Sequence, residues 1–126
     1  MDRLRVLVAG VAAVGLLMVA GTRVAPAQDP AQVNAKLIQV KLDNSRVRVF
    51  ESNLAPGDKE QMHSHPAYIT YVIAGGKIRN HAADGKATEV ELKTGAVIYR
   101  EPLTHWAENI GTTPIRIIIV ELKNPS

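Results

Sequence analysis

Three histidines in this sequence have the spacing of metal ligands. His63 and His65 are separated by one residue, and His105 follows about forty residues later. Side chains of a β-strand alternate between its two faces, so a strand through His63 and His65 would point both imidazoles the same way. His105, arriving from another strand, could supply a third nitrogen. This pattern predicts a metal site built from His63, His65 and His105.

The predicted ligands indicate which metals would bind. Three neutral imidazoles leave a divalent ion with its full charge and an open coordination position, and the chain has no cysteine to add a thiolate. Nitrogen ligands suit Zn, Fe, Ni or Cu, whereas Mg and Ca prefer oxygen. An open position accepts water or an anionic substrate, so such a site supports hydrolytic, isomerising and oxygen-dependent chemistry alike.

Short runs of strand-forming residues separated by turn residues must position these histidines. Gly75-Gly76 and Asp84-Gly85 are typical of tight turns between strands. No stretch after residue 35 has helical periodicity. Eight or nine short strands at these spacings predict an all-β sandwich or barrel. The expected strands cover residues 37–42, 46–50, 60–65, 68–73, 77–81, 87–92, 96–99, 105–109 and 115–122.

The first histidine pair lies in a pattern that resembles a motif of the cupin family, whose members are small jelly-roll β-barrels. That motif is Gly, five residues, His-x-His, three or four residues, Glu, six residues and Gly. In this chain Gly57, His63 and His65 fit it, and Gly75 or Gly76 closes it.

The third histidine lies in a pattern that resembles the second cupin motif: Gly, five residues, Pro-x-Gly, two residues, His, three residues and Asn. Gly95, Pro102, His105 and Asn109 match it, with one residue too few before the histidine and no second glycine. The resemblance covers residues 36–122. It implies a cupin-type jelly-roll β-barrel of antiparallel strands whose metal is bound by the three histidines.

The glutamate that cupins usually add as a fourth ligand is missing. Counting along the motif places Tyr68, Ile69 or Thr70 at its position. The resemblance therefore implies three ligands, or a lost metal and a polar pocket lined by the histidines. Tyr68, whose phenol has a pKa of about 10, would hydrogen-bond a metal-bound water or substrate rather than bind metal. Gln61, on the predicted face of the histidine pair, is the other candidate catalytic residue.

Strand alternation also predicts which side chains face away from the metal. Glu60, Met62 and Ser64 should point outward if a strand covers residues 60–65. Glu51 is a candidate replacement carboxylate if its side chain points inward from the second expected strand. Surface or structural positions are expected for His81, the Arg100-Glu101 pair, Trp106 on the outer face, and Asn109 bracing a turn.

The first 27 residues have the layout of a secretory signal peptide. Arg3 and Arg5 precede an apolar run over residues 6–20, and Ala25-Pro26-Ala27 offers a cleavage site before Gln28. The run is shorter than the roughly 20 residues of a membrane span. The alternative is an uncleaved N-terminal anchor. The predicted organisation is a signal peptide over 1–27, a flexible leader over 28–35 and one cupin domain over 36–126, secreted or periplasmic and not embedded in a membrane.

The positive charge of the chain belongs largely to this predicted signal. The full sequence has 15 basic and 12 acidic residues, and residues 1–27 hold three of the basic residues and one of the acidic ones. The 12 basic and 11 acidic residues that remain give a net charge of +1. Without a basic patch interleaved with aromatics, nucleic-acid binding is not expected.

The sequence leaves three functional interpretations. The first is an exported metal-dependent enzyme acting on a small organic molecule, with dioxygenase-like chemistry favoured only by analogy with the family. The second is a non-catalytic module that binds a small ligand or a metal. The third is a structural dimer with a vestigial site. A homodimer is expected in each case, because cupins commonly pair and exposed apolar strands gain from cover.

Overall fold

The computed structural model describes residues 28–124, which form one short helix and nine strands. The predicted signal peptide over 1–27 lies outside these residues. No helix within 28–124 is long and apolar enough to cross a membrane. The elements are α1 (Pro30–Val33), β1 (Ile38–Asp43), β2 (Val47–Leu54), β3 (His63–His65), β4 (Tyr68–Ala74), β5 (Gly76–Ala82), β6 (Ala87–Leu92), β7 (Val97–Arg100), β8 (Leu103–Asn109) and β9 (Ile115–Leu122).

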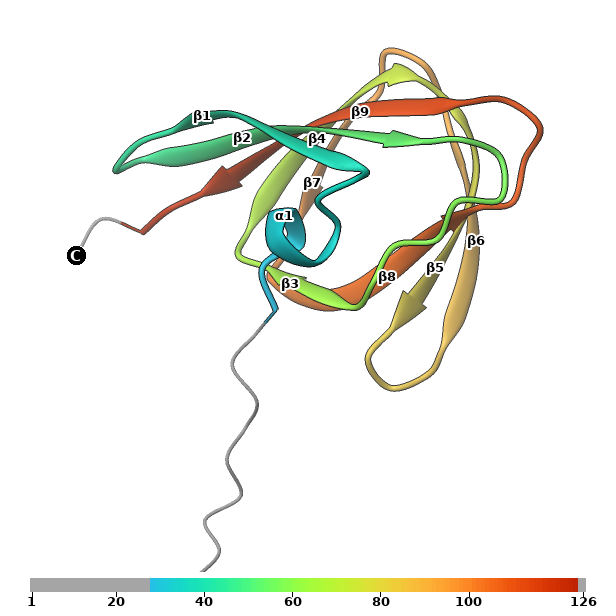
Figure 1. The fold of residues 1–126 in the computed structure, drawn as a ribbon, viewed down its shortest axis with the longest axis horizontal. Coiled ribbons are helices and arrows are strands. Elements are labelled where there is room, and N and C mark those ends of the chain that lie inside the picture. The colour runs from blue at the N-terminus through green and yellow to red at the C-terminus, as the bar shows by residue number, and fades with distance from the viewer. Residues whose placement is uncertain (1–27, 125–126) are drawn as a thin grey trace, which may run out of the picture.

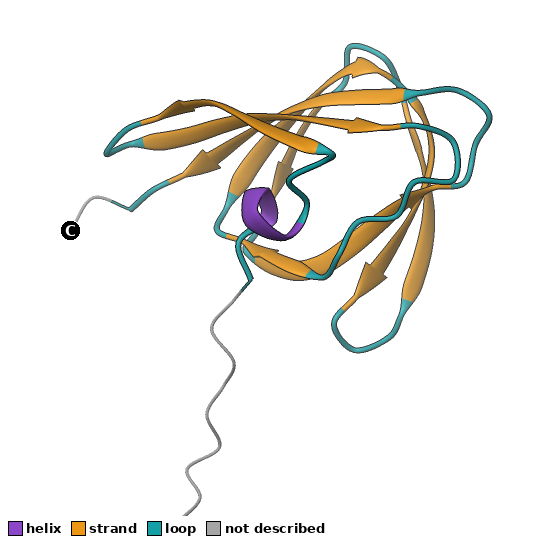
Figure 2. Cartoon of the chain, viewed as in Figure 1, coloured by secondary structure: helices purple, strands orange, loops and turns teal. Residues whose placement is uncertain are grey.

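The strands form two antiparallel sheets that face each other as a jelly-roll barrel (Figures 1 and 2). One sheet has the order β1-β2-β9-β4-β7 and the other β3-β8-β5-β6. Figure 1 shows the β1–β2 hairpin extending beyond the barrel, next to the end of β9. The predicted all-β jelly-roll fold is therefore confirmed.

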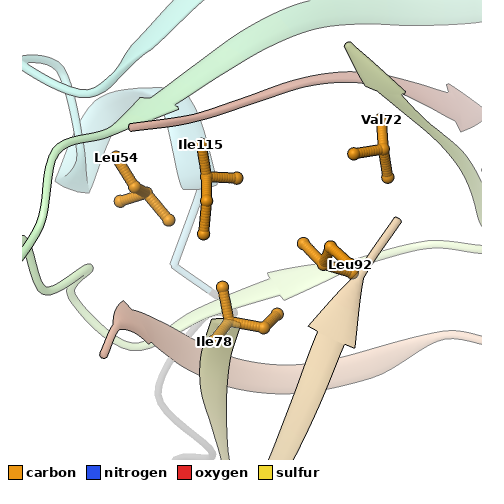
Figure 3. Close-up of a cluster of buried hydrophobic side chains, with 5 residues drawn as sticks. All are labelled: Leu54, Val72, Ile78, Leu92 and Ile115. Carbon is orange, nitrogen blue, oxygen red and sulfur yellow. The ribbon is translucent and has the colours of Figure 1, made fainter. Parts of the chain in front are cut away.

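Alternating burial explains why these sequences form two packed sheets. In β2 the buried side chains Phe50, Ser52 and Leu54 alternate with more exposed ones. One core cluster joins side chains from both sheets (Figure 3). Burying each of its aliphatic side chains contributes about 1.5–3 kcal/mol. The cluster consists of Leu54, Val72, Ile78, Leu92 and Ile115.

Two glycines of the histidine motifs have backbone conformations that favour glycine. Gly57 and Gly95 have φ angles of +86° and +85°, in the left-handed region that other residues rarely adopt. Gly85, in the predicted Asp-Gly turn, has a φ of +89° and connects β5 to β6. Of these positions, Gly57 lies in the connection from β2 to β3, the strand that carries His63 and His65.

Two expected segment boundaries differ from the structure. The strand predicted over 60–65 begins only at His63, so side-chain alternation does not extend back to residue 60. The expected flexible leader over 28–35 contains α1, whose N-terminus is capped by Asp29 accepting hydrogen bonds from the amides of Ala31 and Gln32. This segment packs against the barrel, so the expectation of a loose leader was wrong.

Candidate metal centre

The three histidines converge on one point inside the barrel. His63 and His65 lie on β3, and His63 is the direct cross-strand partner of His105 on β8. Their candidate ligand nitrogens all lie within 4.8 Å of one another. Nε2 of His63 and Nε2 of His65 are 3.0 Å apart. The predicted juxtaposition of these three residues is therefore present.

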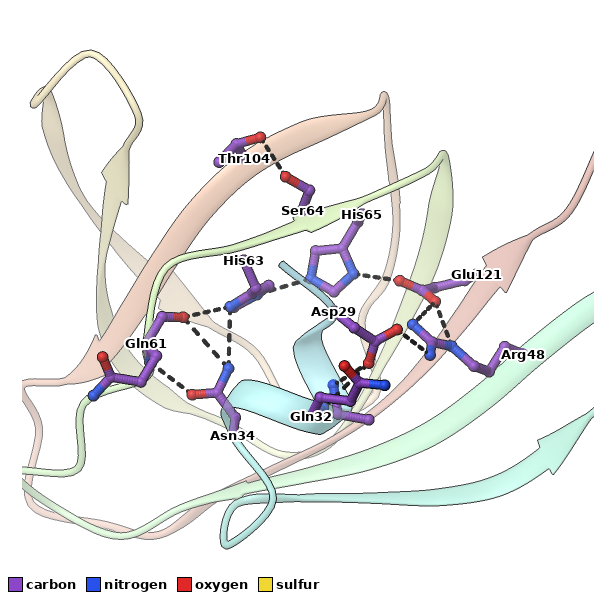
Figure 4. Close-up of polar contacts among 11 residues, drawn as sticks. Asp29, Gln32, Asn34, Arg48, Gln61, His63, Ser64, His65, Thr104 and Glu121 are labelled. Carbon is purple, nitrogen blue, oxygen red and sulfur yellow. Dashed lines mark hydrogen bonds and ion pairs between the residues drawn. The ribbon is translucent and has the colours of Figure 1, made fainter. Parts of the chain in front are cut away.

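The other ring nitrogens of the histidine pair are held by hydrogen bonds (Figure 4). Nδ1 of His63 lies 2.7 Å from the carbonyl oxygen of Gln61, and Nδ1 of His65 lies 2.7 Å from a carboxylate oxygen of Glu121. Because a carbonyl and a carboxylate can only accept, each Nδ1 carries the proton. In the neutral form of each ring, Nε2 is then an unprotonated lone pair, and the two Nε2 atoms point at each other. This arrangement favours a cation between them.

The Glu121 carboxylate continues into a network of ion pairs that reaches α1 (Figure 4). Its Oε1 lies 2.6 Å from Nη2 of Arg48, and Nη1 of Arg48 lies 2.5 Å from Oδ2 of Asp29. Glu121 is only 2% exposed, so this pairing offsets the cost of burying its charge. The residue that caps α1 is thus connected through two ion pairs to the carboxylate that orients His65.

Asn34, at the end of α1, fixes the other histidine of the pair. Its side-chain oxygen accepts a hydrogen bond of 2.6 Å from the amide of Gln61, and its amide nitrogen donates at 3.4 Å to the carbonyl oxygen of Gln61, the same oxygen that accepts from Nδ1 of His63. Asn34 is buried. The N-terminal segment therefore braces both histidines of β3.

Burial keeps His63 and His105 in the neutral form that binds metals. Desolvation lowers the pKa of His63 to about 4 and that of His105 to about 3. The positive charge of each protonated neighbour adds to this effect. Both rings are accordingly neutral near pH 7.

The donor set fits a transition metal. Two nitrogens that are each about 2.1 Å from one ion lie roughly 3.0–3.4 Å apart, which agrees with the spacing of the two Nε2 atoms. Within residues 28–124 no carboxylate joins the three histidines at ligand distance. A set of three imidazoles suits Zn, Fe, Ni or Cu, and the fourth position would stay open.

A cavity of about 330 Å³ adjoins the histidines inside the barrel. Aliphatic side chains from both sheets form about half of its lining, and polar or charged side chains form the rest. Tyr68 also lines it, with its ring centroid 4.5 Å from that of His65. Burial raises the pKa of Tyr68 to about 12, so its phenol stays protonated and is available as a hydrogen-bond donor rather than as a charged ligand.

Glu60 also lines the cavity, which corrects the expectation that it faces outward. It is 9% exposed, and its Oε1 accepts a hydrogen bond of 3.0 Å from the amide of Ala107. Burial raises the pKa of this carboxyl to about 7. The sequence reasoning missed Glu60 because it extended strand alternation through residues 60–62, where the chain is irregular. No local sequence pattern predicts that the Glu60 side chain faces the cavity.

Gln61, in contrast, does not reach the cavity. Its side chain is exposed, and only its main-chain carbonyl contacts the site, at Nδ1 of His63. The structure therefore does not place the Gln61 side chain on the face of the histidine pair, for the same reason as for Glu60. Glu51 pairs with Arg116 on the exposed side of β2 and is not a replacement carboxylate. Met62 is exposed as expected.

The remaining positions divide between structure and cavity. Asn109 braces a turn as predicted, since its amide donates to the carbonyls of Leu54 and Thr113. His81 stacks on Trp106 with ring centroids 3.7 Å apart, and neither lines the cavity. Arg100, expected in a surface pair, instead lines the cavity.

Comparisons with known proteins agree with this architecture. Residues 50–121 match the family model described as the cupin domain. No curated protein matches the chain. The chain is similar to a crystal structure of a cupin domain from Bordetella pertussis, with a TM-score of 0.65 and 26% identity over 70% of this chain and 93% of that one.

Two further crystal structures are similar. One is an uncharacterized protein with a double-stranded β-helix domain from Klebsiella pneumoniae, with a TM-score of 0.56 and 27% identity over 70% of this chain and 77% of that one. The other is a predicted oxalate decarboxylase from Thermotoga maritima, with a TM-score of 0.53 and 24% identity over 69% of this chain and 79% of that one. The likeness to the Thermotoga maritima structure, at 24% identity, bears on the fold alone.

Proposed function

The chain belongs to the cupin domain family, and from this membership we propose that it is a metal-dependent enzyme. It binds one divalent transition-metal ion through His63, His65 and His105 and acts on a small organic molecule in the adjoining cavity. The observation that supports this most directly is the orientation of the two Nε2 lone pairs, enforced by Gln61 and Glu121. Bound there, the ion would supply Lewis-acid or redox chemistry at its open position.

The cavity wall supplies groups that would act on the substrate. Glu60 presents a carboxyl that can take or give a proton, and Tyr68 presents a hydroxyl that none of the hydrogen bonds within residues 28–124 uses. The aliphatic wall would exclude water from the reacting atoms. A titratable carboxyl beside a neutral hydroxyl favours an enzyme over a passive binding module. By analogy with the family, the proposed reaction class is a dioxygenase-like oxidation.

We extend the proposal to an exported homodimer. Export rests on the signal-like layout of residues 1–27 and predicts a mature N-terminus at Gln28, which N-terminal sequencing of the exported protein would test. For the dimer, the outer face of β4 and β7 offers an apolar patch. Tyr71, Val97 and Tyr99 are 47%, 70% and 55% exposed there, and Tyr71 pairs directly with Val97. The apolar strand over 115–122 and Trp106 do not offer such a patch, because β9 lies inside its sheet and His81 stacks on the Trp106 ring.

The test of the metal proposal is metal content by elemental mass spectrometry, on mature protein purified without a metal-affinity tag. We expect about one transition-metal ion per chain, lost in a His63→Ala/His105→Ala variant. His81→Ala is the matched control, because this histidine lies on the outer face, and it should retain the metal. No metal in any sample, even after anaerobic loading with Fe, Zn, Ni or Cu, would reject the proposal.

A further inference from the structure

One row of side chains crosses the inner face of the larger sheet beneath the histidines. On neighbouring strands, Arg48 pairs with Glu121, Glu121 with Tyr68, and Tyr68 with Arg100. Direct cross-strand partners point to the same face with Cβ atoms about 5 Å apart. The row therefore places two cationic residues at its ends, with a carboxylate and a phenol between them.

The two arginines of this row have different surroundings. Arg48 is engaged by Glu121 and Asp29. The guanidinium of Arg100, on the edge strand β7, takes part in none of the side-chain hydrogen bonds or ion pairs found within residues 28–124. Its neighbour in the row is Tyr68, and the next residue, Glu121, already binds Arg48 and His65.

Arg100 is nevertheless not an ordinary surface arginine. It lines the cavity and is half-buried, whereas the next residues on the outer face of β7, Val97 and Tyr99, are exposed. Two other arginines, Arg79 and Arg116, bind carboxylates on the outside of the barrel. A guanidinium keeps its charge under all ordinary conditions and matches a carboxylate with two parallel hydrogen bonds.

The volume and lining of the cavity restrict the size and chemistry of an anion that could pair with Arg100. Part of the wall beyond Arg100 is aliphatic, formed by side chains that include Leu54, Ile98, Ile117 and Ile119, and the uncharged polar side chains of Thr70, Asn80 and Thr88 also line the cavity. A volume of about 330 Å³ is at the small end of the range for ligand pockets. Lys86, exposed at the β5–β6 turn, also lines the cavity and adds a second positive charge.

We infer that the cavity takes a small organic carboxylate, whose carboxylate group is bound by Arg100 beside Tyr68 and whose apolar remainder packs against the aliphatic wall. The inference rests on the proposed function, because it names the substrate class of the same cavity. The carboxylate contact itself is made by the protein and needs no metal ion.

The test compares two acids with their uncharged amides, hexanoate with hexanamide and benzoate with benzamide, by ligand-observed NMR and calorimetry. We expect the wild type to bind at least one acid about tenfold or more tighter than its amide, because hydrogen bonds to charged groups are the stronger ones. Arg100→Gln should abolish this preference while leaving amide binding unchanged, and Arg100→Lys should retain part of it. The matched control is Arg46→Gln, since Arg46 is exposed and outside the cavity.

Equal binding of acid and amide, a preference that survives in Arg100→Gln, or no acid binding at millimolar concentration would each overturn the inference. Metal content is measured on the same samples to separate the two proposals. Metal bound without an acid preference rejects the carboxylate inference alone. An acid preference that depends on Arg100 in protein that binds no metal rejects the metal centre alone.

Discussion

The carboxylate of Glu121 lies 2.7 Å from Nδ1 of His65, although the two residues are 56 positions apart in the sequence. Glu121 is on β9, in the sheet opposite to β3, so this hydrogen bond connects the two walls of the barrel at the metal centre. Such bonds to a ligating histidine fix its tautomer and the direction of its ring. The chain lacks the usual glutamate ligand of the cupin motif. Its Glu121 carboxylate instead orients one of the proposed histidine ligands, His65.

Replacing Glu121 should weaken metal binding without removing a ligand. In Glu121→Gln the charge that favours the Nδ1 proton of His65 is lost, and we expect metal affinity to fall by about tenfold to a hundredfold. The measurement is competition for the metal against a chelator of known affinity. Glu108→Gln is the matched control, because Glu108 also binds a histidine and an arginine, His81 and Arg79, but on the outer face. Equal affinities in the two variants would contradict a role for Glu121 in orienting His65.

The buried amide of Asn34 should be important for stability as well as for the metal centre. Asn34→Ala leaves the amide of Gln61 without its partner, and an unsatisfied buried group costs about 1–3 kcal/mol in the free energy of unfolding. Denaturant unfolding of metal-free protein measures this loss. Gln39→Ala removes an exposed side chain that accepts a hydrogen bond from Lys41, and its effect should stay within about 0.5 kcal/mol. An Asn34→Ala variant as stable as Gln39→Ala would show that α1 does not brace the barrel.

Much of the fold was predictable because its signals are local. Alternating apolar residues and the turns at Gly75-Gly76 and Asp84-Gly85 predict strands that the structure confirms to within a few residues. The His63 and His65 pair was predictable for the same reason, since two residues on one short strand share a face regardless of the rest of the fold.

The surroundings of the metal centre were not predictable in this way. Glu121 and Arg48 meet His65 only through the pairing of β2 with β9, a contact between distant segments that no local pattern encodes. Asn34 contacts the site from a segment expected to be loose. Glu60 faces the cavity because the chain before β3 is irregular, which strand periodicity cannot describe.

The pKa of Glu60, raised by burial to about 7 from 4.5, makes stability depend on pH with a definite sign. The folded state holds this proton more tightly than the unfolded state, so its stabilisation is complete below pH 4.5 and lost as pH rises through about 7. Relative to Glu60→Gln, the free energy of unfolding of the metal-free wild type should fall by up to about 3 kcal/mol over this range. The lowered pKa values of His63 and His105 act in the opposite direction but are common to both proteins and cancel in the difference.

Unfolding in urea at a series of pH values, with a chelator present, gives this difference directly. The variant retains a side-chain oxygen that can accept the hydrogen bond from Ala107, so the comparison isolates the ionisation. A difference that is constant with pH, or that grows as pH rises, would show that Glu60 ionises freely in the folded protein and is not buried in the cavity wall.

Two substitutions of Tyr68 can separate the packing role of its ring from the chemical role of its hydroxyl. The ring is buried against His65 and contributes to the core, whereas no hydrogen bond within residues 28–124 involves the hydroxyl. Tyr68→Phe should therefore change the free energy of unfolding by less than about 0.5 kcal/mol, while Tyr68→Ala, which leaves a cavity, should cost about 3–5 kcal/mol. Metal content should be unchanged in Tyr68→Phe, because the protonated phenol is not a ligand. A loss of metal in that variant would instead make Tyr68 the fourth ligand, in the place of the missing glutamate.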